Sequence, residues 1–431
     1  MLDDRPSDGP LFFISAGDPS GDVHAAELVG CLRRRFPGAR FTAYGGEALQ
    51  AAGCDTPVLL TDLALMWFGR VLVKLPTFIG YLRQAEEFFV KQRPDLVIVV
   101  DFPGFNWHIA RLAKKHRIPV CYFFPPQLWG WAAWRIKKVQ KYIDFCLCSL
   151  PFEESWFNQR GVKAEYIGHP FLAKVRDAKY DESFLTGLRR QYFDRSLLLL
   201  LPGSRDQEVA ANFDDMVKIA QKVTESLPSV TPVIGAFKER HAEMVRRRLA
   251  RENLLWPVFV GRTAELMNLS RAALAVSGSV SMELLAHKKP TVIYYRVSRL
   301  AMLVQRFVRR VKFITLVNII AADIRVSDVA CAADDTSCEA ESPFCSDSQL
   351  MLPAEPTERQ KAMMLFPEIL TCRARTDEAA APLIEYLGST DARTRREERL
   401  AALLAKVDSG DNPSERAAEA IERFLASRSN R

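Results

Sequence analysis

Short apolar runs alternate with amphipathic helical segments along most of this 431-residue chain. Buried strands joined by helices are typical of parallel sheets that helices cover on both faces. Helices such as Val23–Phe36 and Asn106–Lys115 separate most of the runs. The predicted strands form two series, Leu11–Ile14, Phe41–Tyr44, Leu96–Val100, Val120–Phe124, Phe145–Ser149 and Tyr166–Gly168, and then Leu197–Leu201, Thr231–Ile234, Val258–Val260, Leu274–Val276 and Thr291–Tyr295. The pattern therefore predicts an α/β protein with doubly wound, Rossmann-like sheets.

The length of the chain favours two domains, because a single hydrophobic core rarely grows to this size. The series of strands breaks at Gly168-His169-Pro170, and a charged, irregular stretch follows to about Arg195. In doubly wound sheets ligands bind at the carboxyl ends of the strands, so we expect the two domains to face a common cleft. The predicted organisation is a flexible N-terminus at 1–10, an N-terminal domain at 11–168, a C-terminal domain at 169–390 with an acidic insert at about 323–363, and helices at 391–431 that pack back on the N-terminal domain.

Composition limits the class of protein. The chain is 48% hydrophobic and has no apolar run of about 18 residues, so we expect no membrane-spanning helix. The polar N-terminus does not resemble a signal peptide, which predicts a cytoplasmic protein whose nine cysteines are free thiols. No cysteine or histidine spacing predicts a metal site. The net charge of +7 suits an anionic partner, but the basic clusters lack interleaved aromatic residues, which argues against nucleic acid.

The segment Leu65–Leu82 is strongly apolar, and its only charged residues are Arg70 and Lys74. It is too interrupted to span a bilayer. The pattern fits either a pair of core helices or an interfacial patch that dips into a membrane.

The loop Ser15–His24 follows the first predicted strand and leads into a helix expected to start near Gly21. Its glycines match neither of the two common phosphate-binding loops. Because Asp18 and Asp22 would repel a phosphate, the loop is better suited to the hydroxyl groups of a sugar. The alternative is an ordinary turn in which Ser20 or Asp22 caps the helix.

Asp101 stands at the end of the hydrophobic strand Leu96–Val100. Partial desolvation of a carboxylate there would raise its pKa toward the range of a general base. Asn106 begins the next helix and could cap it or bind a ligand. Trp129 and Trp131 could line a sugar or acyl site, or pack the domain.

Two strand-to-helix loops in the C-terminal half are candidates for binding a nucleoside diphosphate. The turn Pro202–Arg205 offers backbone N–H groups around Ser204 and the guanidinium of Arg205, which together suit a diphosphate. The loop Ser277–Ser279 has small residues around Gly278, and Glu283 could accept the hydroxyls of a ribose. Plain turns with routine first-turn residues are the alternative for both.

Taken in order, these motifs resemble the lipid-A-disaccharide synthase family of inverting glycosyltransferases, which have the two-domain GT-B architecture. The resemblance extends from about residue 11 to 385. It rests on Ala16–Asp22, Asp101–Asn106, Trp129–Trp131, Leu150–Glu153, Gly168–Pro170, Leu201–Arg205, Ser277–Glu283, Tyr295-Arg296, Asn318 and Pro367-Glu368.

The resemblance implies a reaction and a set of roles. The family transfers a diacylated glucosamine from its UDP derivative to diacylglucosamine 1-phosphate, forming a β-1,6-linked disaccharide and UDP. Asp101 would be the general base, and Asp18, Ser20 and Gly21 would face the reacting sugars. The remaining residues implied at the site are Asn318 as a catalytic residue and Asn106, Trp129, Ser204, Arg205, Gly278, Ser279, Glu283 and Arg296 as substrate-binding residues.

The resemblance also implies partners. The family needs neither metal nor cofactor, so Arg205, backbone amides and a helix N-terminus would neutralise the diphosphate. The acylated substrates imply a protein bound peripherally to the inner face of the cytoplasmic membrane, with Leu65–Leu82 and basic residues as the contact surface. The resemblance does not decide whether the protein forms a homodimer.

The chain departs from the family pattern at Asp18, Ser279 and Thr371, where Glu, Thr and Gln are usual. Two alternatives therefore remain beside the synthase. One is a GT-B transferase or epimerase that acts on another UDP-sugar, and the other is a degenerate protein that binds a UDP-lipid without turnover.

Overall fold

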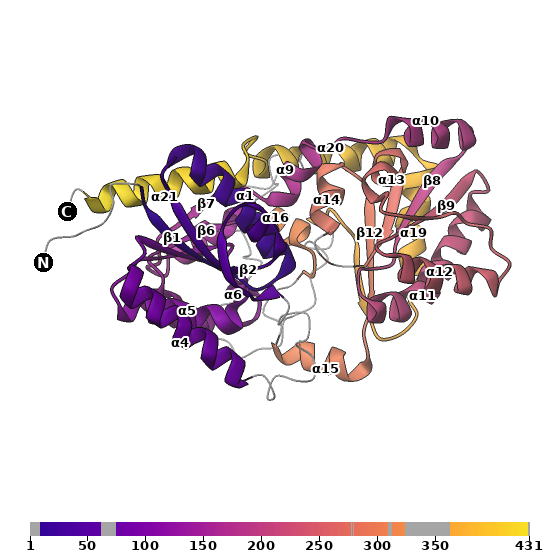
Figure 1. The fold of residues 1–431 in the computed structure, drawn as a ribbon. Helices are drawn as coiled ribbons and strands as arrows, with labels where there is room; N and C mark the ends of the chain where they lie inside the picture. Colours follow the sequence, from indigo (N-terminus) through magenta and orange to yellow (C-terminus); the bar gives the residue numbers. More distant parts are fainter. Residues whose placement is uncertain are drawn as a thin grey trace, which may run out of the picture. The chain divides into compact units, whose positions relative to one another are not determined.

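A computed structural model describes residues 9–61, 75–276, 278, 280–308, 313–323 and 363–429 (Figure 1). The chain forms two compact units, one of Met1–Pro170 with Ser409–Arg431 and the other of Phe171–Asp408. Ser279, most of Leu65–Leu82 and the expected insert up to residue 362 lie outside the described residues.

The first unit is built on a seven-stranded parallel sheet with the strand order β3-β2-β1-β4-β5-β6-β7. Its strands are β1 (Leu11–Ala16), β2 (Arg40–Gly45), β3 (Asp55–Leu59), β4 (Leu96–Val100), β5 (Val120–Phe123), β6 (Phe145–Cys148) and β7 (Ala164–Tyr166). Its helices are α1 (Pro19–Arg35), α2 (Glu47–Ala51), α4 (Leu75–Gln92), α5 (Pro103–Lys115), α6 (Leu128–Trp131), the 3-10 turn η1 (Ala133–Arg135), α7 (Ile136–Tyr142), α8 (Pro151–Asn158) and α21 (Pro413–Ser429).

Strand β1 shows why this sheet is apolar on both faces. Alternate residues of a strand point to opposite sides, so Phe12 and Phe13 enter different layers of the core. Phe12 belongs to a buried cluster with Leu28 of α1 and Ile421 of α21. The Phe13 ring lies 5.0 Å from that of Phe89 on α4. Helices therefore cover both faces, as the continuous apolar strands predict.

The second unit holds a six-stranded parallel sheet with the order β10-β9-β8-β11-β12-β13. Its strands are β8 (Ser196–Leu201), β9 (Val230–Ala236), β10 (Val258–Val260), β11 (Ala272–Ala275), β12 (Thr291–Arg296) and β13 (Glu368–Thr371). Its helices are α9 (Pro170–Arg176), α10 (Glu182–Gln191), α11 (Asp206–Ser226), α12 (Glu239–Ala250), α13 (Thr263–Leu269), α14 (Val280–Ala286), α15 (Arg299–Val308), α16 (Leu316–Asp323), α19 (Thr376–Gly388) and α20 (Thr390–Val407). The two sheets confirm the predicted fold class.

Three details differ from the sequence expectations. The charged stretch before Arg195 is not irregular, because it contains α9 and α10. The edge strands β3 and β13 were not among the predicted strands. The segment 391–431 is divided, because α20 contacts α19 and α14 of the second unit, whereas α21 packs on α1 of the first.

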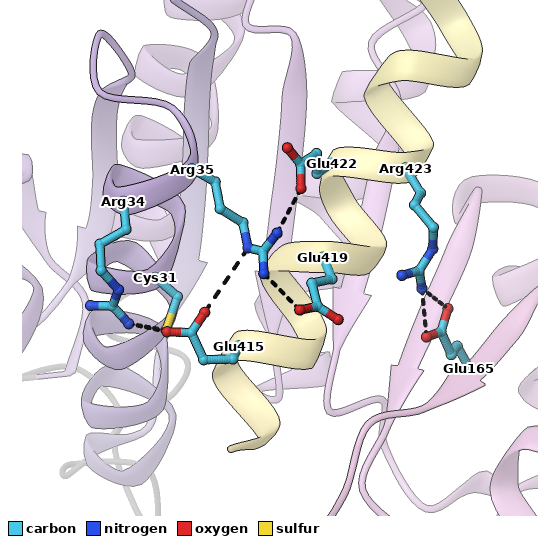
Figure 2. Close-up of polar contacts among 8 residues, drawn as sticks. All are labelled: Cys31, Arg34, Arg35, Glu165, Glu415, Glu419, Glu422 and Arg423. Carbon is cyan, nitrogen blue, oxygen red and sulfur yellow. Dashed lines mark hydrogen bonds and ion pairs between the residues drawn. The ribbon is translucent and has the colours of Figure 1, made fainter. Parts of the chain in front are cut away.

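Helix α21 docks on α1 through an apolar face, and ion pairs lie beside this face. Ala417, Ala418 and Ile421 are fully buried, and the Phe424 ring lies 4.4 Å from that of Phe145. Beside them Arg35 pairs with Glu419 and Glu422, each at 2.7 Å, as Figure 2 shows. Arg34 pairs with Glu415, and Arg423 with Glu165. Exposed ion pairs contribute about 0–1 kcal/mol each, so the apolar face dominates the docking.

Among the described residues, no helix is both long and apolar enough to cross a bilayer.

Candidate functional site

Apart from Trp129, which follows β5, the functional residues expected in the first unit lie at the carboxyl ends of β1 and β4. These two strands are neighbours in the sheet, and their last residues, Ala16 and Val100, pair with one another. The loop that starts at Gly17 and the turn at Asp101-Phe102 therefore leave the sheet side by side. This is the edge at which doubly wound sheets bind ligands.

Asp101 is held in an unusual backbone conformation. Its φ is 43° and that of Phe102 is 41°, so two consecutive residues other than glycine are left-handed. Such residues cost about 1–3 kcal/mol each and persist only where surrounding contacts fix them. Here the carbonyl oxygen of Asp101 accepts hydrogen bonds from Asn106 Nδ2 and from the Tyr122 hydroxyl, both at 2.9 Å. These contacts fix the backbone of the turn from which the Asp101 side chain extends.

Asn106 is fully buried and connects the two strand ends. Its Oδ1 accepts a hydrogen bond from Ser15 Oγ at 2.6 Å, and its Nδ2 also lies 3.0 Å from the Val100 carbonyl oxygen and 3.2 Å from that of Ser15. With both ends of the amide engaged, Asn106 neither caps the helix through its side chain nor offers a group to a ligand. Its place in the structure is that of a positioning residue for Asp101, in contrast to the expected substrate-binding role.

Burial raises the pKa of Asp101 to about 6, and the negative charge of Asp18 adds to this rise, while a backbone hydrogen bond from Phe102 opposes it. Burial also raises the pKa of Asp18. Asp18 occupies the N-cap position of α1 but makes no capping hydrogen bond with its side chain. The loop after β1 and the turn after β4 thus bring two carboxylates together. One of them, that of Asp101, has a pKa suited to accepting a proton near neutral pH.

The rest of the first loop is fitted closely around these acids. A Cβ on Gly17 would lie 2.1 Å from the Phe102 ring, so only glycine fits there, and one on Gly21 would just touch Val100. Ser20 is exposed. The buried Asp22 accepts hydrogen bonds from the backbone N–H groups of Gly46 and Ala48. Neither capping alternative for α1 holds, because Ser20 lies inside the helix, whose N-cap residue is Asp18, and the Asp22 carboxylate caps α2 instead.

Trp129 is a buried packing residue in this structure. Its Nε1 donates a hydrogen bond to Glu153 Oε1 at 2.9 Å, and its ring packs edge-on against Phe152. Glu153 also accepts from the Leu150 backbone N–H, and burial raises the pKa of Glu153 to about 7. Of the two alternatives for Trp129, the structure supports packing of the domain. The Trp131 side chain is outside what the structure describes.

In the second unit, Arg205 follows β8 and is the N-cap residue of α11. Its side chain is 80% exposed, and its Nη1 contacts Glu208 Oε1 at 2.9 Å. The backbone N–H groups of Ser204 and Arg205 both donate to Glu208 Oε2, at 3.0 and 3.2 Å. The guanidinium is therefore largely exposed to solvent, whereas these two backbone groups are already occupied by Glu208.

Gly278 and Glu283 belong to the loop and helix after β11, the strand next to β8. Among the described residues other than its chain neighbours, none has a heavy atom within 4 Å of the place where a Cβ of Gly278 would be. Glu283 lies in the first turn of α14, 4.0 Å from Lys174 Nζ. Burial raises the pKa of Glu283, and Lys174 opposes the rise. Ser279 lies outside the described residues.

Arg296 and Asn318 are engaged in internal contacts. Arg296 Nη1 contacts the buried Asp215 at 3.0 Å, and its backbone N–H donates to Asn212. The Asn318 amide is buried, donates to the Phe366 carbonyl oxygen and to Glu368, and accepts from the backbone N–H groups of Leu365 and Phe366. These four contacts use all hydrogen-bonding capacity of the Asn318 amide in this structure.

Sequence reasoning missed Glu208 and Tyr122. A glutamate three residues after an N-cap residue is a known helix-start pattern, and it could have identified Glu208. No pattern indicates Tyr122, because its contact with Asp101 comes from the pairing of β4 with β5.

Comparisons with known proteins identify the family of this chain. A protein-family profile described as "Lipid-A-disaccharide synthetase" matches residues 12–364. The lipid-A-disaccharide synthase of Myxococcus xanthus is 32% identical over 72% of this chain and 81% of its own length. That of Syntrophus aciditrophicus is 34% identical over the same shares, and lipid-A-disaccharide synthase 1 of Legionella pneumophila is 31% identical over 73% and 82%.

Solved structures confirm the fold. The S. aureus MnaA–UDP co-structure has a TM-score of 0.57 at 12% identity and covers 97% of both chains. A UDP-N-acetylglucosamine 2-epimerase has a TM-score of 0.56 at 12% identity and covers 98% of this chain and 97% of its own. At this identity the likeness concerns the fold alone, which is the two-domain α/β GT-B type.

The extent of the family match and the identity to relatives across both units lead to one conclusion: this chain belongs to the lipid-A-disaccharide synthase family, the glycosyltransferases of lipid A biosynthesis.

Proposed function

We propose that this protein transfers a 2,3-diacylglucosamine group from its UDP derivative to 2,3-diacylglucosamine 1-phosphate. The 6-hydroxyl oxygen of the acceptor attacks the anomeric carbon of the donor, and the bond from that carbon to the diphosphate breaks. The acceptor proton goes to Asp101, and UDP leaves. The products are the β-1,6-linked disaccharide 1-phosphate and UDP.

The observation that carries this proposal is the carboxylate of Asp101 at the end of β4, with its pKa raised to about 6 by burial and by Asp18. Above that pH the carboxylate is ionised and can accept the acceptor proton. Direct attack with inversion needs one base and no covalent nucleophile. Asp18, with the exposed Ser20 and with Gly21, would contact hydroxyl groups of the sugars.

The leaving diphosphate would be stabilised by Arg205, whose guanidinium is exposed, and by the loop around Gly278 and Ser279. Glu283 would accept hydrogen bonds from the ribose. This proposal needs no metal ion, because a guanidinium and oriented dipoles stabilise the developing charge. We therefore expect a chelator to leave turnover unchanged.

We further propose that the protein works at the inner surface of the cytoplasmic membrane, since both substrates carry acyl chains. On α4, Ile79 of the expected patch Leu65–Leu82 is 42% exposed. On α15, Leu300 and Leu303 are 71% and 52% exposed, and residues 299–312 carry five Arg or Lys and no Asp or Glu. Exposed leucines in a basic helix suit an anionic lipid surface.

The test is product analysis with purified protein, dispersed acylated donor and acylated acceptor, with and without EDTA. We expect disaccharide 1-phosphate and UDP in equal amounts under both conditions, and no product from unacylated UDP-N-acetylglucosamine. An epimerised UDP-sugar formed without acceptor would favour the epimerase alternative. Binding of the donor without UDP release would favour the non-catalytic one.

A further inference from the structure

Glu208 occupies the centre of the turn that carries Arg205. Its side chain is 11% exposed, whereas that of Arg205 is 80% exposed. Oε2 accepts the backbone N–H groups of Ser204 and Arg205, and Oε1 contacts the Arg205 guanidinium. One carboxylate thus holds both the backbone and the side chain of the same residue.

Gly203 makes this arrangement possible. Its φ of +117° is in the region that favours glycine, and a Cβ there would lie 2.7 Å from Glu208 Cβ and 2.9 Å from Glu208 Oε2. Any larger residue at this position would displace the carboxylate. The turn is therefore shaped around the Glu208 side chain.

Further residues on the face of α11 that carries Glu208 also hold the neighbouring backbone in place. Glu208, Asn212 and Asp215 follow one another at helical spacing, so they lie on one face of the helix. Asn212 Nδ2 donates to the Glu208 carbonyl oxygen at 2.7 Å, and Asn212 Oδ1 accepts the backbone N–H of Arg296. Asp215 accepts from the Tyr294 hydroxyl and from Arg296. The face joins the turn after β8 to the end of β12, the strands on either side of β11.

We propose that Glu208 is a positioning residue for substrate binding. It holds Arg205 in place, and the guanidinium N–H groups that Glu208 does not contact then bind the diphosphate of the donor. This inference rests on the proposed function, because it takes a UDP-sugar as the donor. It also assigns the backbone N–H groups of Ser204 and Arg205 to Glu208 rather than to the phosphates.

The opposite possibility is that Glu208 occupies the place of the diphosphate and leaves when the donor binds. Its low exposure, the fit against Gly203 and the engagement of both oxygens argue against this. The two possibilities predict opposite effects, because removal of a positioning residue weakens UDP binding, whereas removal of a competing anion strengthens it.

The experiment measures UDP affinity by calorimetry, and kcat and KM for donor and acceptor, in the full-length protein and its variants. For Glu208→Ala we expect the UDP Kd and the donor KM to rise at least about tenfold, with acceptor KM changed less than about twofold. Glu208→Gln keeps one oxygen for the two backbone groups and loses the contact with the guanidinium. We expect it to fold and to weaken UDP binding about threefold to fivefold.

Glu378→Ala is the matched control. Arg375 and Glu378 form the same pair of N-cap residue and third helical residue at the start of α19, with Arg375 Nε 2.6 Å from Glu378 Oε1. Glu378 is 53% exposed, against 11% for Glu208, so this variant should lose little stability and keep UDP affinity. An unchanged or tighter UDP Kd in Glu208→Ala, or an unchanged one in Glu208→Gln if the alanine variant does not fold, would overturn the inference. Failure of the wild-type protein to release UDP from the acylated substrates would instead overturn the proposed function.

Discussion

Asp101 is an acid whose burial works against the stability of the folded protein. Its pKa of about 6 in the folded protein exceeds the ordinary value of about 3.9, so folding favours the protonated form. The stability that this protonated carboxyl contributes is fully present below about pH 4 and is lost as the pH rises through 6.

The first prediction follows from this sign. Asp101→Asn is neutral at all pH values and similar in shape, so it should melt several degrees higher than wild type at pH 8, corresponding to about 2–3 kcal/mol at most. The difference should vanish near pH 4. Thermal melts at pH 4, 6 and 8 measure it, and a variant that melts below wild type at pH 8 would contradict the raised pKa.

A second prediction concerns Asp18, whose charge helps to raise the pKa of Asp101. Asp18→Asn removes that charge, so the pKa of Asp101 should fall. The acid limb of the profile of kcat against pH should then move to lower pH, whatever happens to the maximum rate. Ser20→Ala, in the same loop, should leave the limb in place. An acid limb that stays at the wild-type pH in Asp18→Asn would show that the charge of Asp18 does not raise the pKa of Asp101.

At the scale of elements, the ends of β1 and β4 are tied by one buried side chain. Asn106→Ala would leave the carbonyl oxygens of Val100 and Asp101 with fewer partners and would free the strained turn at Asp101-Phe102. We expect a loss of about 2–4 kcal/mol in stability and a fall in kcat of at least about tenfold.

Asn158→Ala supplies the comparison for this third prediction. Its amide also bonds twice to the backbone, at Ala164, but at the start of β7 and away from Asp101. It should lower the melting temperature and leave kcat close to wild type. Equal losses of kcat in the two variants would show that Asn106 contributes only to stability.

The strands and their order of succession followed from the sequence, because apolar runs such as Leu96–Val100 are buried on both faces and lack any polar alternation. The edge strands β3 and β13 were not predicted, because Asp55–Leu59 and Glu368–Thr371 contain few apolar residues and are only partly buried. Local pattern also marks Asp101 and Arg205 at strand ends. It could not show that Asp22 caps a distant helix or that Asn318 is saturated, because those partners are set by tertiary packing.

At the scale of the whole molecule, the residues proposed to carry the chemistry follow the carboxyl ends of parallel strands in both units, and the leucines proposed to meet lipid lie on α15, which follows β12. The fourth prediction concerns these leucines. Leu300→Ser combined with Leu303→Ser should reduce flotation with vesicles rich in phosphatidylglycerol at least about threefold, because both leucines are exposed. UDP affinity should not change.

Phe193→Ser is the control for the vesicle experiment. Phe193 is 84% exposed, but it lies beside α10 in a different part of the second unit. It should float as the wild type does. Equal flotation of the wild type and the double variant would exclude α15 from the lipid contact.

The central claim is that Asp101 is the general base of a glycosyl transfer and does not contribute to binding of the donor. The measurement is UDP release from acylated donor and acceptor by wild type and Asp101→Asn, with the UDP Kd of both. We predict release by wild type and a fall of at least about a thousandfold in the variant, with UDP affinity within twofold of wild type. Near-normal UDP release by Asp101→Asn would contradict the account.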